Sequence, residues 1–304
     1  MKVKLIKNAL VYKAELPSAE ALTTHLEEEL FEEAEPMAAG SIGFVPRDGF
    51  TLVDTFPGGI SFTVRIDEKI IPAGAVRTEL EKRVKATCES MGLRRIGKAM
   101  RAEIKDGIIV EFRRKALIRS THVICLYDTK NGYLVIPTTS RTTAGAITSL
   151  LVKAVGSVKT ETIHVSDVKH GLTTRMNAWL SDDADAFGDF NPCEEVDLAD
   201  GNQKVTIKMD SLTNARVGLE KAIRDGFTVK SMRLCAGNEV KFRLTSDFSF
   251  KSIDFPVLDV ESSEIDDLWL HEASVQLLSF SAIVTELCDM FGYQEPEQEE
   301  KEAA

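Results

Sequence analysis

The dipeptide Asn131-Gly132 is the sequence feature that most constrains the fold of this chain. It stands between two strand-like runs, residues 117–127 and 133–137. Asparagine and glycine readily adopt the positive φ angles that a tight hairpin turn requires. We therefore expect the two runs to pair as an antiparallel hairpin.

Ahead of this hairpin, the sequence predicts one helix and four strands in the order β-α-β-β-β. Ser18 is a candidate N-cap for the helix, which carries apolar residues on one face and glutamates elsewhere. Turn sequences with proline and glycine separate the three strands that follow. The expected strands are residues 3–14, 42–45, 50–55 and 60–66, and the helix is residues 18–34.

The remaining elements follow no fixed period. Two helices, residues 76–91 and 94–110, precede the hairpin, although Gly92, Gly97 and Gly107 weaken the second. This mixed order favours an α+β fold, with mixed or antiparallel sheets and packed helices, over a doubly wound parallel sheet. The segments expected after the hairpin are helices at residues 140–155, 173–180, 212–224 and 265–291, and strands at residues 160–165, 204–209, 227–234, 240–244 and 248–253.

Two places in the sequence favour a division into domains. Pro72 and Gly74 mark one joint, and the acidic stretch at residues 181–191 is the best candidate for another boundary. We expect a central α+β domain at residues 1–75, a basic helical and hairpin finger at 76–180, and a base domain at 181–304 that ends in a helix and an acidic tail.

The composition is typical of a soluble globular protein. Hydrophobic residues make up 43% of the chain and charged residues 28%. No apolar run approaches the roughly 20 residues that span a bilayer, and no signal peptide is evident. The five cysteines are scattered without a C-x-x-C pair, so neither a disulfide framework nor a zinc site is indicated. We expect a cytoplasmic protein without a metal or other cofactor and without a membrane partner.

Charge is distributed very unevenly along the chain. Residues 77–119 contain thirteen basic and six acidic residues, a net charge of +7 in a chain of net charge −11. Residues 254–304 contain fourteen acids and one base. Most charge runs are simply solvated helix faces, but a local excess against the global sign also fits a surface that meets a polyanion.

Residues 92–99, GLRRIGKA, approximate the phosphate-binding P-loop sequence. They end in Ala99, where a P-loop needs a serine or threonine hydroxyl for magnesium. The preceding residues also have a helical pattern instead of that of a buried strand. The sequence therefore argues against nucleotide binding here.

Two further clusters carry polar ligand-type residues. Asp183, Asp185 and Glu194 fit positions of a calcium-binding loop, but Phe187 occupies a ligand position and Pro192 interrupts the loop. His164 and His170 match neither a zinc-protease pattern nor a nucleophile elbow. A solvated acidic loop and ordinary surface histidines are the stronger interpretations, and no catalytic residue is identified.

Seven short segments form an ordered series along essentially the whole chain. The segments are LIKNALVY at residues 5–12, GFVP at 43–46, DEKIIP at 67–72, KAL at 115–117, YDTKNG at 127–132, GSV at 156–158 and KMDSLT at 208–213. In this series the chain resembles the recombination-associated RdgC family. No single segment is specific, but together they occur in the family's order and at nearly its spacings.

The resemblance implies a horseshoe-shaped subunit that pairs with a twofold mate into a ring, a homodimer with a cationic hole for duplex DNA. It implies binding to double-stranded DNA, with single-stranded DNA as an open alternative, regardless of sequence. It also implies restraint of RecA-promoted recombination and a nucleoid-associated location. Phosphate contacts by lysine and arginine bind any sequence alike, which agrees with a basic segment lining the hole.

Two residues can be carried over from the resemblance. Leu117 aligns with an aromatic residue at a finger tip, and Lys208 with a lysine at the gate of the ring. Met209 departs from a glutamine beside that lysine. The DNA-binding residues we expect are Arg94, Arg95, Lys98, Arg101, Arg113, Arg114, Lys115, Leu117, Arg119, Lys204 and Lys208.

Two alternatives remain open from the sequence. One is a metal-dependent enzyme that processes nucleic acid through Asp183 and Asp185. The other is an interaction scaffold whose final helix, residues 265–291, docks a partner, although an apolar stripe at helical spacing is usually core or dimer interface. The preferred hypothesis is a DNA-binding protein that is not an enzyme.

Overall fold

The hairpin predicted around Asn131-Gly132 is confirmed in the computed structural model, where β5 (Leu117–Asp128) turns into β6 (Tyr133–Ile136). Gly132 has φ of 68°. The buried side chain of Asp128 holds the turn, because its Oδ1 accepts hydrogen bonds of 2.8 and 2.9 Å from the amides of Lys130 and Asn131. The structure describes residues 5–47, 51–163, 168–183, 185–201, 203–208, 212–237, 240–256 and 268–293, without the side chains of residues 168–170 and 212–214.

The first sheet has seven strands in the order β2-β4-β5-β6-β1-β7, with β3 paired to β4. The predicted β-α-β-β-β order is present, and Ser18 accepts the N-capping hydrogen bond from Ala21. Helices α1 and α4 contribute Leu22, Leu26, Ile147 and Leu151 to the core of this sheet. The elements are β1 (Leu10–Lys13), α1 (Ala19–Glu27), β2 (Gly40–Val45), β3 (Val53–Phe56), β4 (Gly59–Ile70), α4 (Arg141–Val155) and β7 (Glu161–Thr162).

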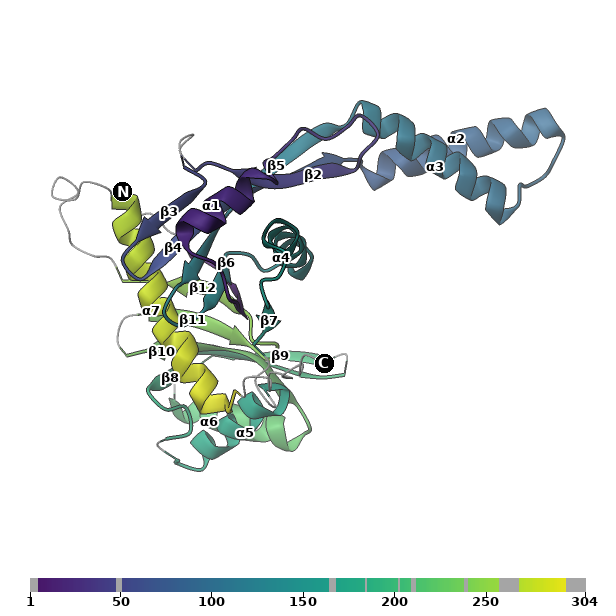
Figure 1. Ribbon diagram of the computed structural model, residues 1–304. Helices are drawn as coiled ribbons and strands as arrows, with labels where there is room; N and C mark the ends of the chain where they lie inside the picture. Colours follow the sequence, from purple (N-terminus) through teal and green to yellow (C-terminus); the bar gives the residue numbers. More distant parts are fainter. Residues whose placement is uncertain are drawn as a thin grey trace, which may run out of the picture.

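The second sheet has five strands in the order β12-β11-β10-β8-β9. Every strand pairing in both sheets is antiparallel, so the α+β class with antiparallel sheets is confirmed. The helices α5 and α6 lie below this sheet in Figure 1. The elements are α5 (Val168–Leu180), β8 (Phe190–Asp200), β9 (Gln203–Lys208), α6 (Leu212–Arg224), β10 (Thr228–Ala236), β11 (Val240–Thr245) and β12 (Phe250–Asp254).

Strand β8 is missing from the sequence prediction, which placed part of it in an acidic loop. Pro192 and the positive φ of Glu194, 54°, are features typical of loops. Glu194 fits because the pairing of β8 with β10 shifts register there, between the pairs Val196–Met232 and Cys193–Arg233. Pro192 fits because it lies outside the segment of β8 that pairs with β9. A further shift, the first along β10, lies between Val229 and Ser231.

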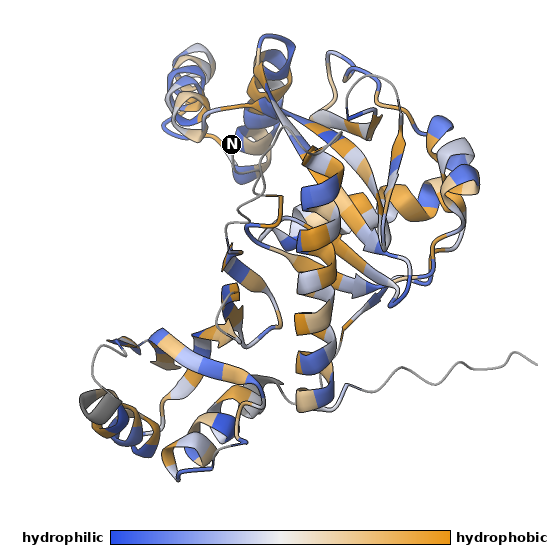
Figure 2. Ribbon diagram, turned by 90° about the vertical axis from the view of Figure 1, so that its left-hand side faces the viewer, coloured by the Kyte–Doolittle hydropathy of each residue, from blue (hydrophilic) through white to orange (hydrophobic). Residues whose placement is uncertain are grey.

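Helix α7 (Leu268–Phe291) runs alongside both sheets and is largely apolar in Figure 2. It contacts β3 and β5 of the first sheet, and the Phe280 ring packs against Phe250 of the second with centroids 4.9 Å apart. Among the helices that the structure describes, α7 alone is long and apolar enough to cross a membrane by length and composition. Its buried side chains join a core to which strands of both sheets contribute, which is the pattern of a core helix.

Helices α2 (Ala73–Met91) and α3 (Lys98–Arg114) form an arm that projects from the body (Figure 1). The arm continues the long strands β4 and β5, which pair from Gly59–Asp128 to Ile70–Leu117. The far end of the arm is the loop of residues 92–97. The helix predicted at residues 94–110 therefore exists, but it begins at Lys98 and ends at Arg114.

Candidate nucleic-acid interface

The two helices of the arm are held together by a small apolar seam. Val76, Leu80 and Ile108 are buried between them, and Ile104 and Phe112 pack against these three residues. A seam of this size leaves most of both helices in solvent. The arm is therefore a slender element whose surface consists mainly of charged side chains.

The basic residues of α2 are largely neutralised within the arm. Arg77 pairs with Glu81 at 3.4 Å, and Lys85 with Glu89 at 4.0 Å. Arg83 is held by Glu79 at 2.8 Å and also reaches Glu111 of α3. The pairs within α2 follow the helical spacing of four residues, which places opposite charges side by side. Little of the positive charge on α2 remains for a partner.

The positive charge of the loop and of α3 remains unpaired. Arg94, Arg95, Lys98, Arg101 and Lys105 are exposed, and none forms an ion pair within 4.0 Å with another residue that the structure describes. The first four were predicted to bind DNA; Lys105 was not. Unpaired guanidinium and ammonium groups on a projecting element are suited to phosphate groups of any sequence.

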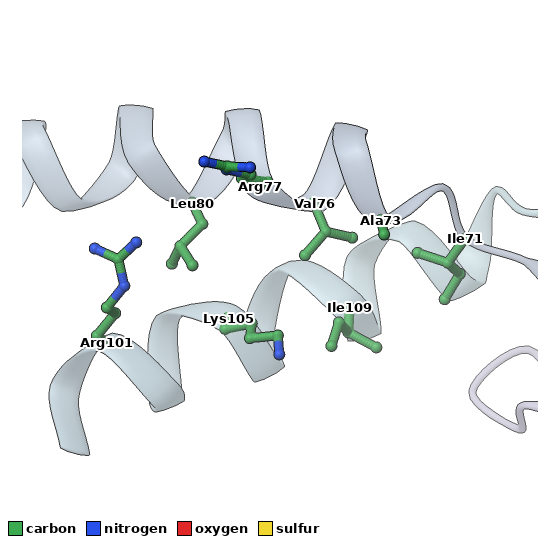
Figure 3. A pocket seen from close by; sticks show the side chains of 8 residues that line it. All are labelled: Ile71, Ala73, Val76, Arg77, Leu80, Arg101, Lys105 and Ile109. Carbon is green, nitrogen blue, oxygen red and sulfur yellow. The ribbon is translucent and has the colours of Figure 1, made fainter. Parts of the chain in front are cut away.

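A groove of about 560 Å³ lies along one side of the arm, between α2 and α3. Figure 3 shows Val76 and Leu80 pointing from α2 toward α3, with Ile109 on α3 opposite them. Arg101 and Lys105 also line the groove. The predicted contact residue Arg101 therefore lies beside apolar surface as well as in solvent.

The local geometry argues against the P-loop interpretation of residues 92–99. Gly92 follows helix α2 and has a left-handed backbone, with φ of 62°. Its amide and that of Leu93 donate to the carbonyl oxygens of Glu89 and Cys88, at 3.4 and 2.9 Å. These amides cap α2 and are not available to surround a phosphate.

At the root of the arm, the predicted residues Arg113 and Arg114 end α3, and Lys115 is its C-cap. Arg114 donates through Nε to the sulfur of Met37 at 3.3 Å. Arg119 is paired with Glu68, its direct neighbour across the sheet. The charge of Arg119 is therefore partly neutralised, unlike that of Arg94 or Arg95.

Leu117 lies at the root of the arm and not at its far end. It begins β5 three residues after α3 ends, opposite Ile70 of β4. Its side chain is 79% exposed, and Ile70 is 47% exposed. The resemblance implies a finger-tip position for Leu117, whereas the loop of residues 92–97 occupies the far end of this arm. Leu117 and Ile70 form an exposed apolar pair instead.

Lys204 and Lys208 lie on β9, the edge strand of the second sheet. They share one face with Thr206, because alternate residues of a strand point to the same side. Their partners on β8 are Ala199 for Lys204 and Glu195 for Lys208. Val196 and Leu198 of β8 point to the opposite, buried face. Both lysines therefore belong to the polar face of the second sheet.

Lys230 and Lys251 join this region but are absent from the predicted contact residues. Lys230 lies at the first β10 register shift, and Lys251 pairs with Arg243 across β11 and β12. One sequence signal could have indicated a charged face on this sheet: in β11, Lys241 and Arg243 alternate with apolar neighbours. The register shift at Lys230 was not evident from the sequence.

The acidic segment considered as a metal site has other contacts. Asp183 accepts a hydrogen bond of 3.1 Å from the amide of Asp185 within a turn. Phe187 is buried, and Glu194 lies in β8, paired with Arg233 at 2.9 Å. Within the described ranges, no three histidine, cysteine, aspartate or glutamate residues are placed to hold a metal ion. The calcium-loop interpretation is not supported.

Three positions singled out in the sequence lie outside what the structure describes. These are His164, the side chain of His170 and Met209.

Comparisons with known proteins identify similar chains over nearly the full length. The family model described as "RdgC: Putative exonuclease, RdgC" matches residues 5–293. The recombination-associated protein RdgC of Neisseria meningitidis serogroup C (strain 053442) is 29% identical over 294 residues, which cover 92% of this chain and 95% of the relative. The protein of the same name from Pseudomonas fluorescens (strain Pf0-1) is 26% identical over 308 residues, 96% of this chain and 98% of the relative.

Proposed function

Because this chain belongs to the RdgC family, whose relatives are named recombination-associated proteins, we propose that it binds DNA independently of sequence and restrains RecA-promoted recombination. In this proposal the protein acts by occupying DNA that RecA would otherwise coat. It works in the cytoplasm, at the nucleoid, without a cofactor.

The unpaired positive charge on the loop and α3 is the observation that carries this proposal. The acids of α2 neutralise the bases of α2, whereas Arg94, Arg95, Lys98 and Arg101 have no ion-pair partner among the described residues. Each phosphate that such residues neutralise releases condensed counterions, so binding is strong at low salt and insensitive to base sequence. The arm presents these residues away from the body.

We also propose that two copies close into a ring around duplex DNA. The resemblance to the RdgC family supports a closed homodimer of horseshoe-shaped subunits. In Figure 1 the arm leaves the body on the same side toward which β9, with Lys204 and Lys208, extends. DNA in such a ring would meet the arm and the polar face of the second sheet together.

The family model's description names an exonuclease, and a nuclease would need a catalytic centre. A metal-dependent nuclease usually needs several carboxylates around one or two metal ions. Asp183 and Asp185 form a local turn, and the described residues provide no cluster of three such ligands. These observations favour binding without cleavage.

The central test is a gel-shift titration of the full chain with two unrelated duplexes of equal length across a salt series. We expect equal affinities, with log K falling by about 0.9 per phosphate contact as log salt rises. An affinity unchanged between low and physiological salt, or a strong preference for one duplex, would contradict the proposal. The same duplexes incubated with Mg²⁺ or Mn²⁺ test for cleavage, which would favour the enzyme.

Encirclement has its own test. Linear and sealed circular duplexes of equal length should show different loading kinetics, because a closed ring must open before it can load on a circle. Sedimentation should give a dimer. A monomer with full DNA affinity would rule out the ring while leaving DNA binding intact.

A further inference from the structure

A pocket of about 600 Å³ opens on the polar face of the second sheet. Its lining draws on all five strands, including Lys204 and Thr206 of β9, Asp197 of β8, Lys230 and Ser231 of β10, and Lys251 of β12. A pocket of this volume is in the usual range for small-molecule sites. It lies apart from the arm in the sequence and in the fold.

The floor of the pocket is a row of polar side chains across four strands. Thr206 pairs with Asp197, Asp197 with Ser231, and Ser231 with Thr245. Thr206 Oγ1 and Ser231 Oγ each donate to Asp197, at 2.7 Å in both cases. Ser231 and Thr245 are buried, so this hydrogen-bonded row is fixed in place.

The two carboxylates in the lining are already neutralised by arginines outside it. Arg243 donates to Asp197 at 2.6 Å, and Arg141 donates to Asp247 at 2.8 Å. Hydrogen bonds from hydroxyl groups complete both sites. The acids therefore do not cancel the charge of the lysines in the pocket.

Lys204, Lys230 and Lys251 supply the remaining charge of the pocket. None of the three forms an ion pair within 4.0 Å with any residue in the described ranges. Three ammonium groups beside hydroxyl groups attract an anion with several oxygen atoms. They disfavour a metal cation, which the same charges would repel.

We propose that this pocket binds a phosphate group of a nucleotide, either within a DNA strand or in a free nucleotide. The lysines would neutralise the phosphate, and the volume leaves space for an attached sugar. For DNA as the source, this inference rests on the proposed function and adds a second binding surface to the arm. It assigns binding roles to Lys230 and Lys251, in addition to Lys204, which the sequence already predicted as a DNA contact.

The test replaces the three lysines together, as K204A/K230A/K251A in the full chain. A matched variant, K7A/K130A/K221A, removes the same charge from exposed lysines outside the pocket lining, none of which forms an ion pair with a residue that the structure describes. Thermal melting of both should remain close to wild type, since the replaced side chains are exposed except Lys230, which is half-buried. Replacing the pocket lysines by arginine should preserve binding.

With a DNA phosphate in the pocket, the pocket variant should bind duplex at least about tenfold more weakly, as expected when charge-assisted hydrogen bonds are removed. Its salt slope should fall by about 0.9 for each phosphate that it no longer neutralises. The matched variant should change far less. Equal decreases in duplex affinity in the two variants would show that the pocket does not bind a DNA phosphate.

The second arm of the test measures binding of inorganic phosphate and of deoxyadenosine monophosphate by nuclear magnetic resonance. Shifts of pocket residues that vanish in the pocket variant, while its duplex affinity is no lower than that of the matched variant, identify a free nucleotide as the source. Absence of nucleotide binding, together with equal decreases in duplex affinity, overturns the inference. Stronger binding of a polyglutamate peptide than of either phosphate probe overturns it as well. Absence of duplex binding by the wild type would instead refute the proposed function.

Discussion

Arg83 of α2 and Glu111 of α3 meet across the arm through two parallel hydrogen bonds, 2.9 Å from Nη1 to Oε1 and 2.6 Å from Nη2 to Oε2. The Arg83 guanidinium lowers the pKa of the Glu111 carboxyl. This two-pronged interaction joins the two helices beside an apolar seam with only three buried residues among those described, and because both groups are accessible to solvent its contribution is modest.

Replacing Glu111 by Gln should therefore loosen the arm. We expect faster amide hydrogen exchange in α2 and α3, with exchange in both sheets unchanged. The contribution of Glu111 is present above its ordinary pKa of 4.5 and disappears as the pH falls through the lowered value. E111Q should remove that acid dependence. The control E103Q changes the same charge at an exposed position of α3, and equal exchange in both variants would contradict this role.

Basic residues of the arm should differ in their effect on DNA binding according to their pairing. The variant R94A/R95A/K98A removes unpaired charge, whereas R77A/K82A/K85A removes charge that acids of α2 already neutralise. Gel shifts should show the larger decrease in affinity for the first, with a salt slope reduced by about 0.9 for each phosphate that is no longer neutralised. Identical decreases would mean that only net charge matters.

Leu117→Asp tests the exposed apolar pair at the root of the arm. Leu117 is 79% exposed, so we expect the free energy of unfolding to change by less than about 0.5 kcal/mol. Duplex affinity should fall while the salt slope stays nearly intact, because an apolar contact to DNA releases few counterions. A collapsed slope would place this residue among the phosphate contacts.

Asp247 should make stability depend on acid pH. Burial raises its pKa, but hydrogen bonds from Thr245, Arg141 and Ser249 outweigh this and lower the pKa to about 2. Its stabilising effect is then complete above its ordinary pKa of 3.8 and disappears as the pH falls toward 2. Urea unfolding should give D247N a lower free energy of unfolding than the wild type at pH 7. This difference should shrink as the pH falls from 3.8 toward 2. The exposed control D106N should show no such window.

Phe280→Ala tests the packing between α7 and the second sheet. The side chain is fully buried, and its ring meets Phe250 edge-on at 78°. Truncation should cost about 3–5 kcal/mol of unfolding free energy, measured by urea denaturation. Leu278→Ala, at a position 45% exposed on the same helix, should cost far less. Similar costs would mean that α7 is not anchored through Phe280.

Local chemistry predicted much of the fold correctly. The Ser18 N-cap and the Asn131-Gly132 turn each act through neighbouring residues and are where the sequence places them. Strand β8 could not be predicted because its left-handed Glu194 is accommodated by a register shift against β10, and its proline lies outside the segment that pairs with β9. Such a shift depends on a partner strand about 40 residues away in sequence.

The sequence predicted which kinds of residue form the candidate site, but not how they are arranged in space. The excess of positive charge in residues 77–119 is evident from composition. The sequence does not show which of these charges remain unpaired. The pairing of Arg83 with Glu111, for example, requires α2 and α3 to come together. The pocket of Lys204, Lys230 and Lys251 combines three strands, and no linear pattern connects them.

The position of α7 late in the sequence determines the order in which parts of the protein can fold during synthesis. The side-chain oxygen of Gln276 accepts hydrogen bonds from the amides of Leu5 and Ile6, residues 271 and 270 positions earlier. A nascent chain therefore forms its arm early, from contacts between nearby residues, but keeps the apolar surface facing α7 open until α7 itself has been synthesised. Products that stop before residue 268 would carry the basic arm on an unfinished body, which makes them targets for chaperones and proteases.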